Sequence, residues 1–224
     1  RFVLPHVPSL RPTWLIRLGL ILYDWMGGFI SFPKSKVINL ENDYDENPIK
    51  SDYTKGYEYS DLFVDDARLV LLNAQDAISK GAKIYTNANI QKVIRKRDNW
   101  EVFLNNGEVL YSKVIINASG PYALDVLNNL IGIQSQKKIR HVQGSHIITE
   151  KLYKGEQAYI LQLDDKRIIF LIPYLDKYTL IGTTDHEVKS YDNPKITDIE
   201  KKYLISSVNK FIKNKITEDN IIWT

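Results

Sequence analysis

Cysteine is absent from this chain of 224 residues. Without a thiol, a disulfide framework, a thiolate metal site and a cysteine nucleophile are all excluded. The sequence also lacks a Gly-x-Ser-x-Gly nucleophile elbow, a Gly-x-Gly-x-x-Gly turn and a phosphate-binding P-loop. Short motifs taken one at a time therefore do not indicate an enzyme, and the sequence gives little support for nucleophilic hydrolysis.

Long hydrophobic runs and a strong net charge are also missing. The longest apolar stretch near the start, residues 18–23, lies between Arg17 and Asp24 and is far shorter than the roughly 20 residues of a membrane span. Lys and Arg number 30 against 27 Asp and Glu, a net charge of +3 that is spread evenly and does not predict nucleic-acid binding. Hydrophobic residues make up 44% of the chain, which is ordinary for a globular protein with a sizeable core.

The histidines do not suggest a metal site. His6 and His186 fall in predicted loops, and His141 and His146 lie five residues apart on a strand predicted over 139–149. On a regular strand their side chains would point to opposite faces, unless Gly144 introduces a bulge. No pair has the spacing of metal ligands, so we expect no metal.

The first 33 residues predict a short strand, a proline-containing turn and a helix. Apolar residues from Trp14 to Trp25 recur at helical spacing, and Gly27 with Gly28 is expected to end the helix. These apolar residues cover much of the helix circumference, which favours burial in protein over contact with a lipid surface. Core, subunit interface and lipid contact remain the three alternatives.

The clearest local signal lies in the middle of the chain. Asp65 and Asp66 predict the capped start of a helix that ends at Gly81, and residues 82–86 and 113–117 are predicted strands. Between them, residues 90–111 predict a small meander with a tight turn at 105–107. The second strand leads through the turn 117–121 into a helix, as in α/β units.

After Gln134 the pattern changes to longer strands in an antiparallel meander, followed by an amphipathic helix at about 197–213. The predicted fold class therefore combines α/β and α+β structure. We expect three segments: 1–63 as the first part of a sheet domain with its helix, 64–130 as a partial α/β domain, and 131–224 as the antiparallel sheet and last helix.

Nine short motifs in one order resemble a known family, the FAD-dependent, quinone-linked glycerol-3-phosphate dehydrogenases of the D-amino-acid-oxidase-like flavoproteins. The resemblance covers essentially all of the chain, and its strength lies in the order of the set. The motifs are RFVLPH (1–6), LRP (10–12), YEYSD (57–61), VDDARL (64–69), NASGP (117–121), QGSHI (143–147), AYILQ (158–162), IGTTD (181–185) and IWT (222–224).

The resemblance implies that 64–130 is part of a FAD-binding Rossmann-like domain and that the rest builds an antiparallel-sheet substrate domain. In the family, the glycine-rich FAD loop precedes the position of Arg1, and the arginine for the substrate phosphate follows that of Thr224. We therefore expect a central fragment of a longer enzyme, one that does not retain FAD by itself.

The resemblance also implies an activity. The parent enzyme would oxidise sn-glycerol 3-phosphate to dihydroxyacetone phosphate, pass the electrons through FAD to membrane quinone, and lie in the cytoplasm against the inner face of the cell membrane. The resemblance leaves open whether the enzyme forms a homodimer. The alternatives are a non-enzymatic remnant or a related oxidase that passes electrons to oxygen.

By resemblance, His146 matches the family's proposed base. A base with a pKa near neutrality suits removal of a hydroxyl proton, and histidine titrates in that range. The competing interpretation is a histidine that packs on its strand and bonds to the backbone.

The cofactor contacts implied by the resemblance lie around one turn and one strand. Small residues and N–H groups at the start of a helix suit the FAD pyrophosphate, although an ordinary strand-to-helix turn looks the same. Ser119 stands where the family commonly has Thr, and Tyr122 where it usually has Trp, which leaves a contact at 122 in doubt. The implied contacts are Asn117, Ala118, Ser119, Gly120 and Tyr122, with the main chain of Val93 against adenine.

Overall fold

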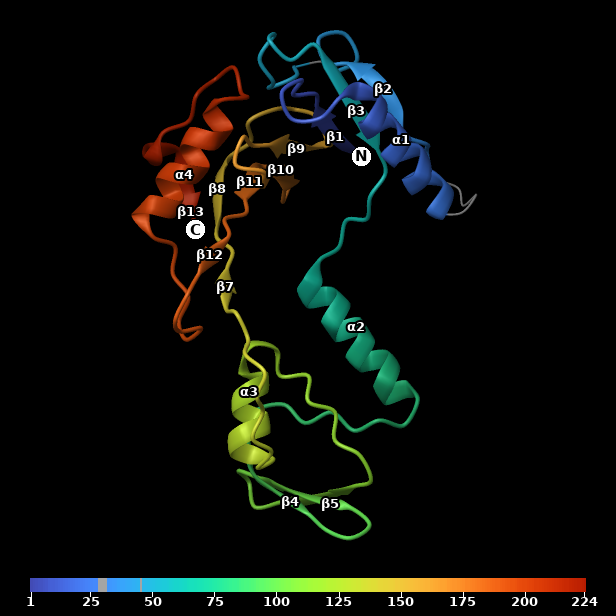
Figure 1. The fold of residues 1–224 in the computed structure, drawn as a ribbon, viewed down its shortest axis with the longest axis vertical. Helices are drawn as coiled ribbons and strands as arrows, with labels where there is room; N and C mark the ends of the chain where they lie inside the picture. The colour runs from blue at the N-terminus through green and yellow to red at the C-terminus, as the bar shows by residue number, and fades with distance from the viewer. Residues whose placement is uncertain (28–31, 45) are drawn as a thin grey trace. The chain divides into compact units, whose positions relative to one another are not determined.

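The computed structural model describes residues 1–27, 32–44 and 46–224, which form two compact units (Figure 1). Unit 1 comprises Arg1–Leu62, Val142–Val188 and Asp192–Thr224; unit 2 comprises Phe63–His141 and Lys189–Tyr191. The helices are α1 (Thr13–Met26), α2 (Asp66–Ser79), α3 (Ala123–Asp125) and α4 (Asp198–Asn209), and the shorter helical turns are η1 (Gly120–Tyr122), η2 (Val126–Leu130) and η3 (Glu218–Asn220).

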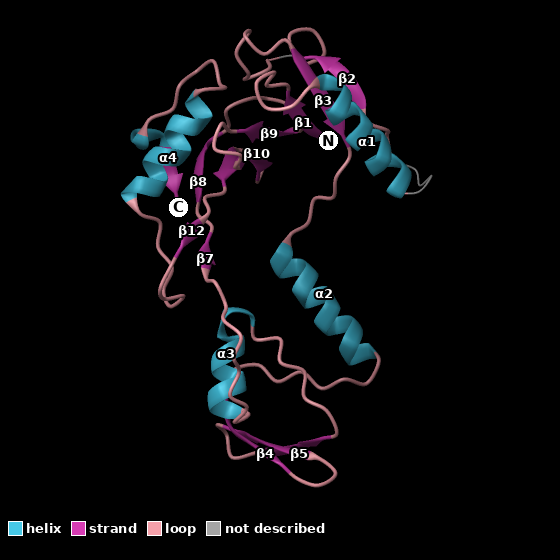
Figure 2. Cartoon of the chain, viewed as in Figure 1, coloured by secondary structure: helices cyan, strands magenta, loops and turns pink. Residues whose placement is uncertain are grey.

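A mixed sheet forms the centre of unit 1, and Figure 2 shows its strands. Its order is β13-β8-β11-β10-β9-β1-β3-β2, and of these neighbours only β1 and β9 run parallel. The predicted antiparallel meander over 158–183 is confirmed as β9, β10 and β11. The strands of this unit are β1 (Phe2–Pro5), β2 (Lys36–Asn39), β3 (Lys55–Tyr59), β7 (Val142–Gln143), β8 (His146–Glu150), β9 (Ala158–Gln162), β10 (Ile168–Tyr174), β11 (Tyr178–Gly182), β12 (His186–Glu187) and β13 (Ile221–Trp223).

The core of unit 1 lies between one face of this sheet and α4. Alternate strand residues such as Ile147, Leu171 and Ile181 are fully buried, as the two-residue period of a strand requires. Leu204 and Val208 of α4 belong to the same cluster. The sequence predicted this helix at about 197–213. The structure caps it at Thr197, whose side chain accepts a hydrogen bond from the N–H of Glu200.

The predicted helix near the N-terminus is confirmed as α1. Ile16 and Leu20 pack against a second apolar cluster around Tyr57, whereas no residue of α1 is itself buried. Most of the apolar side chains from Trp14 to Trp25 are exposed among the described residues. Within that part of the chain, no helix is both long and apolar enough to cross a membrane.

Unit 2 contains a three-stranded antiparallel meander and α2. The meander consists of β4 (Ile90–Arg95), β5 (Trp100–Leu104) and β6 (Val109–Ser112), and Gly107 turns it with a φ of +86°. The predicted ends of α2 are confirmed, because Asp65 accepts a hydrogen bond from the N–H of Arg68 and Gly81 has a φ of +92°.

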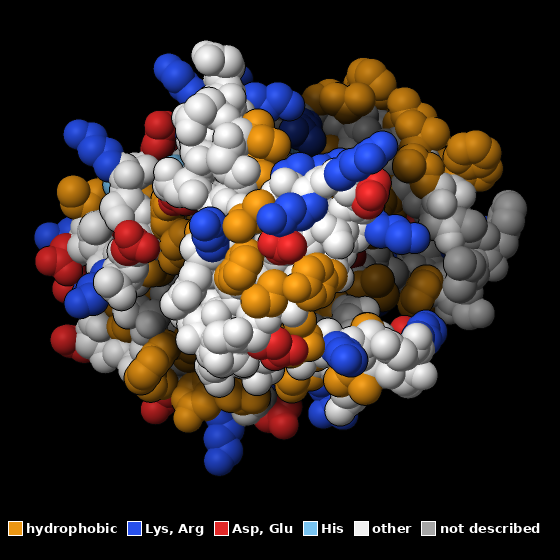
Figure 3. All heavy atoms as spheres, turned by 90° about the horizontal axis from the view of Figure 1, so that it is seen from below, with side chains coloured by type: hydrophobic (Ala, Val, Ile, Leu, Met, Phe, Trp, Pro, Cys, Tyr) orange, Lys and Arg blue, Asp and Glu red, His pale blue; other side chains and the backbone are white. Residues whose placement is uncertain are grey.

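Two predicted strands of unit 2 are wrong, because residues 82–86 and 113–117 adopt no strand. A strand needs a hydrogen-bonded neighbour, and no described backbone pairs with either segment. Ile84 and Ile116 are exposed, and so are most apolar residues of α2. Figure 3 likewise shows apolar side chains gathered at the molecular surface. These segments do have an apolar pattern, but no described residues cover their apolar side chains.

Candidate functional site

His146 begins β8 and lies opposite Gly182 of the neighbouring β11. The imidazole lies directly over this glycine: a Cβ at position 182 would overlap with Cδ2 of His146 and lie 2.8 Å from its Nε2. The His146 ring can therefore lie against the sheet here because Gly182 has no side chain. The residue itself is exposed, so the imidazole is accessible to a substrate.

The pKa of His146 is lowered from its usual value of 6.5, because neighbouring protein partly shields the ring from water and disfavours the charged form. The imidazole is therefore neutral near pH 7, as a proton acceptor must be. The strand predicted over 139–149 is interrupted at Gly144 and Ser145, between β7 and β8. His141 falls in unit 2, so the two histidines do not share one regular strand.

Glu200 is buried in unit 1 and joins the two segments next to the His146–Gly182 pair, one from each strand. Its carboxylate accepts hydrogen bonds of 2.8 Å from the hydroxyls of Ser145 and Thr184. Ser145 also donates its N–H to the Thr184 hydroxyl at 2.8 Å. Sequence reasoning missed this role, although the spacing Thr197-x-x-Glu200 before an apolar run is a capping-box signal.

Burial by itself would raise the pKa of Glu200, but hydrogen bonds from the Thr197 backbone and from the Ser145, Thr184 and Thr197 side chains outweigh it. The pKa therefore lies below its usual value of 4.5. The carboxylate stabilises the fold above that pH, and this contribution is lost as the pH falls through the folded-state pKa.

Replacement of Glu200 by Gln is expected to lower the free energy of unfolding by about 2–3 kcal/mol, because a buried charged acceptor with several donors is lost. Urea denaturation at pH 7 measures the change. Part of the acid-induced loss of stability below pH 4.5 should also disappear. The exposed Glu150→Gln serves as the matched control; an equal effect in both variants would contradict a special role for Glu200.

Gly182→Ala is expected to turn the His146 ring away while leaving the fold intact, because the added methyl meets the ring and not the backbone. In the FAD-loaded parent protein we expect kcat to fall about tenfold, on the scale of a misplaced general base. Parallel measurement of kcat and of the urea midpoint separates the two effects. A variant with unchanged kcat would show that the ring position does not matter.

The segment predicted to face a cofactor forms one ordered turn in unit 2. The Asn117 side chain accepts hydrogen bonds from the N–H (3.3 Å) and hydroxyl (2.6 Å) of Ser119 and donates to the carbonyl of Ala123 at 2.9 Å. Gly120 has a φ of +58°, and a Cβ there would meet nothing within 4 Å. Ala118 and Gly120 are exposed, so this turn is open to a phosphate group at the start of the helical run from η1 to η2.

Val93 lies on β4, an edge strand of the meander in the same unit, opposite Val102. An edge strand keeps one row of backbone groups unpaired, which suits a main-chain contact to a ligand. Strand β4 also contacts η2, so Val93 and the helical run after the 117–122 turn belong to one packed body. His146 lies in the other unit.

Tyr122 packs edge-on against Tyr191, with ring centroids 4.7 Å apart. Tyr191 also donates a hydrogen bond to the carboxylate of Asp125, so residue 191 holds both the turn and the helix that follows. The sequence offered no signal for this contact, because Tyr191 lies far along the chain from 122. Among the described residues, no group of three or more His, Asp or Glu side chains is placed to hold a metal ion.

Comparison with known proteins gives one family match. The model of the DAO family, described as FAD dependent oxidoreductase, matches residues 31–224. The D-erythritol 1-phosphate dehydrogenase of Brucella abortus is 42% identical over 99% of this chain and 45% of its own length. The glycerol-3-phosphate dehydrogenase of Pseudomonas aeruginosa is also 42% identical, over 99% of this chain and 44% of its own length.

A solved structure shows the same fold. The glycerol-3-phosphate dehydrogenase from Bacillus halodurans, complexed with FAD, is 21% identical and has a TM-score of 0.64 over 98% of this chain and 41% of its own. The chain thus spans less than half the length of these three relatives.

Proposed function

Because the chain belongs to the FAD-dependent oxidoreductase family, we propose that its parent protein oxidises sn-glycerol 3-phosphate to dihydroxyacetone phosphate. The observation that carries the proposal is the 42% identity to a glycerol-3-phosphate dehydrogenase across 99% of the chain. The open position of His146 over Gly182 supports it, because this oxidation needs an accessible base.

The residues of this chain would have separate roles in the reaction. Bound FAD supplies a hydride acceptor for the hydrogen on C2 of the substrate. The neutral imidazole of His146 takes the proton of the C2 hydroxyl. The N–H groups of Ala118 and Gly120, two exposed residues of the 117–122 turn, would meet the cofactor pyrophosphate, and the main chain at Val93 would meet the adenine. The turn fits this task because Asn117 holds it open and Gly120 adds no side chain.

The electron acceptor that we propose is membrane quinone, with the parent protein held peripherally at the cytoplasmic face of the membrane. The family resemblance carries this part of the proposal. A flavin oxidase would use the same residues but would release hydrogen peroxide. Measuring peroxide during turnover, with and without a soluble quinone, decides between the two acceptors.

A second substrate has a specific observation in its favour. The D-erythritol 1-phosphate dehydrogenase of Brucella abortus is as similar to this chain as the glycerol-3-phosphate dehydrogenase. Both substrates named by these relatives are polyol phosphates, so the same base chemistry serves either one.

The experiment is a dye-reduction assay of the FAD-loaded parent protein with sn-glycerol 3-phosphate, D-erythritol 1-phosphate and unphosphorylated glycerol. We expect the highest kcat/KM with sn-glycerol 3-phosphate and little reduction with glycerol. A higher value with D-erythritol 1-phosphate would establish the second substrate. Absence of reduction with either phosphate would contradict the proposal.

A further inference from the structure

A β-bulge lies directly before His146 in the sheet. The ladder of β8 with β11 ends at the pair His146–Gly182, and the ladder of β7 with β12 resumes at the pair Gln143–His186. Two residues separate these pairs on the first strand, whereas three separate them on the second. An extra residue on one side bends the strand and changes the direction of the side chains beside it. We call the residues between the two pairs the bulge: 144–145 and 183–185.

The position of the His146 ring depends on the backbone around it. Among the described residues, no protein group forms a hydrogen bond with the imidazole, which lies against Gly182 of the neighbouring strand. A ring without such a bond keeps its place only while its own strand and β11 keep theirs. A general base has to stay within hydrogen-bond reach of the proton that it takes. Whatever fixes the bulge therefore also fixes this ring.

The two sides of the bulge are bonded to each other through Thr184. Ser145 donates its N–H to the hydroxyl of Thr184 at 2.8 Å, and the N–H of Thr184 donates to the carbonyl of Ser145 at 3.3 Å. Gly144 permits this close approach, because a Cβ at that position would lie 2.5 Å from the hydroxyl oxygen of Thr183. The side chain and the N–H of Thr184 thus satisfy backbone groups that the interrupted ladder leaves without a partner.

The carboxylate of Glu200 bonds to both sides of the bulge from α4. One oxygen, Oε1, accepts from the hydroxyls of both Ser145 and Thr184 at 2.8 Å. The other, Oε2, accepts from the N–H and hydroxyl of Thr197 at 2.8 and 2.9 Å, which fixes the carboxylate to the start of the helix. Ser145, Thr184 and Glu200 are 8%, 4% and 5% exposed. Hydrogen bonds to a buried charge are among the strong ones, so this contact holds the two strands in one arrangement.

We propose that Thr184 and Glu200 are positioning residues for His146, which hold the bulge so that the imidazole stays over Gly182. The inference rests on the proposed role of His146 as the base and adds what keeps that base in place. Because the two residues act on the strands and not on the ring, both ring nitrogens stay available to the substrate hydroxyl.

The test is Thr184→Val in the FAD-loaded parent protein, because valine keeps the shape of threonine and removes both hydroxyl contacts. We expect kcat with sn-glycerol 3-phosphate to fall about tenfold, on the scale of a misplaced base, and KM to stay within about twofold of the wild type. Thr184→Ser keeps the hydroxyl and should restore kcat to within about threefold of the wild type.

The matched control is Thr179→Val on the same strand, β11. Thr179 is also fully buried, and its hydroxyl also accepts a backbone hydrogen bond, from the N–H of Leu152 at 3.1 Å. Both variants lose a buried hydroxyl and leave a backbone N–H without its partner, so both should be destabilised. Urea denaturation compares the two losses of stability. We expect Thr179→Val to keep kcat within about twofold of the wild type.

A double-mutant cycle shows whether Thr184 acts through His146. In a His146→Ala background the base is already absent, so adding Thr184→Val should change kcat by no more than about twofold. A further tenfold loss would overturn the proposal, because the bulge would then support turnover in another way. Wild-type kcat in the Thr184→Val single variant would overturn it as well.

Nuclear magnetic resonance reads the position of the ring without turnover. In the FAD-loaded parent protein labelled with carbon-13 at histidine Cε1, the His146→Ala variant identifies the His146 signal. We expect this signal to titrate below pH 6.5 in the wild type and in Thr179→Val, and closer to 6.5 in Thr184→Val, where the ring leaves its partly buried place. A signal unchanged by Thr184→Val would overturn the proposal. A wild type that oxidises neither polyol phosphate would contradict the proposed function, and this signal would still decide what holds the ring.

Discussion

Replacement of His146 by Ala in the FAD-loaded parent protein is expected to lower kcat by about 100-fold or more and to leave the flavin content unchanged. A positioned general base contributes on this scale, and alanine cannot take the C2 hydroxyl proton. The flavin should stay because His146 belongs to unit 1, whereas the predicted pyrophosphate turn and Val93 belong to unit 2. Steady-state dye reduction gives kcat, and the visible spectrum gives the flavin content.

The matched control is His186→Ala, an exposed histidine on β12 of the same unit. We expect its kcat to stay within about twofold of the wild type. A His146→Ala enzyme that turns over within a few-fold of the wild type would identify His146 as a packing residue.

The pH profile gives a second readout of the same group. A base is active when neutral, so kcat/KM should rise as the pH increases through the pKa of His146. Because partial burial lowers that pKa, the midpoint of the acid limb should lie below 6.5. The limb should vanish in the alanine variant.

Residues 1–224 by themselves are expected to lose FAD on desalting. The 117–122 turn supplies a few charge-assisted hydrogen bonds of roughly 1.5–3 kcal/mol each, whereas immobilising a ligand costs an estimated 4–15 kcal/mol. Among the described residues nothing covers the apolar side chains of α2 or pairs with the segment 82–86. The chain also spans 44% of the length of a related glycerol-3-phosphate dehydrogenase.

The measurement is the visible spectrum after incubation with excess FAD and gel filtration. The control is a protein extended on both sides to the length of its relatives, which should retain close to one flavin per chain. A stoichiometric flavin band in the 224-residue chain would show that this span suffices for binding.

Local signals predicted much of the secondary structure because they act over a few residues. Asp65 and Gly81 marked the ends of α2 through capping geometry, and the turn around Gly107 marked a hairpin. The family match confirms the resemblance that the ordered motifs indicated. None of these signals required knowledge of distant contacts.

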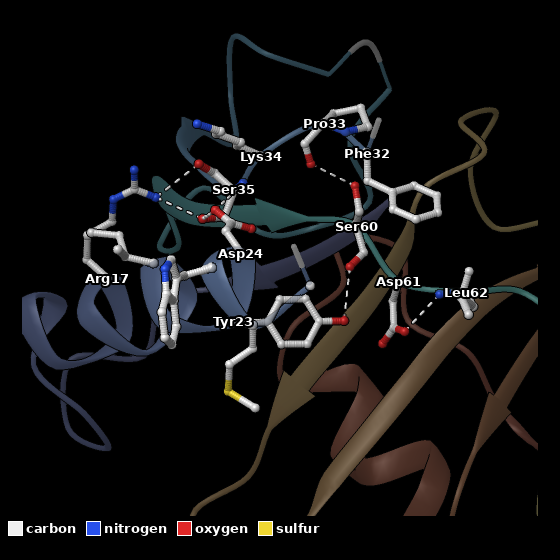
Figure 4. A pocket seen from close by; sticks show the side chains of 14 residues that line it. Arg17, Tyr23, Asp24, Phe32, Pro33, Lys34, Ser35, Ser60, Asp61 and Leu62 are labelled. Atoms are coloured by element: carbon white, nitrogen blue, oxygen red, sulfur yellow. Dashed lines mark hydrogen bonds between the residues drawn. The ribbon is translucent and has the colours of Figure 1, made fainter. Parts of the chain in front are cut away.

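The errors and omissions come from contacts between distant residues. Residues 82–86 have the composition of a strand, but a strand forms only beside a neighbour, and none is described here. Two features join segments that are far apart in sequence: the parallel pairing of β1 with β9, and the hydrogen bonds that Ser145 and Thr184 donate to Glu200. For helix α1 the sequence favoured burial in protein over contact with lipid and left core, subunit interface and lipid contact open. In the structure its two charged side chains bond to Ser35, as Figure 4 shows, and most of its apolar residues are exposed.

Anaerobic stopped-flow reduction of the bound flavin by sn-glycerol 3-phosphate tests the central claim most directly, because it isolates the chemical step from the electron acceptor. The account predicts that substrate bleaches the flavin absorbance in the wild type, and that His146→Ala slows the bleaching by about 100-fold or more at saturating substrate. Bleaching at the wild-type rate in the variant, or no bleaching in the wild type, would contradict it.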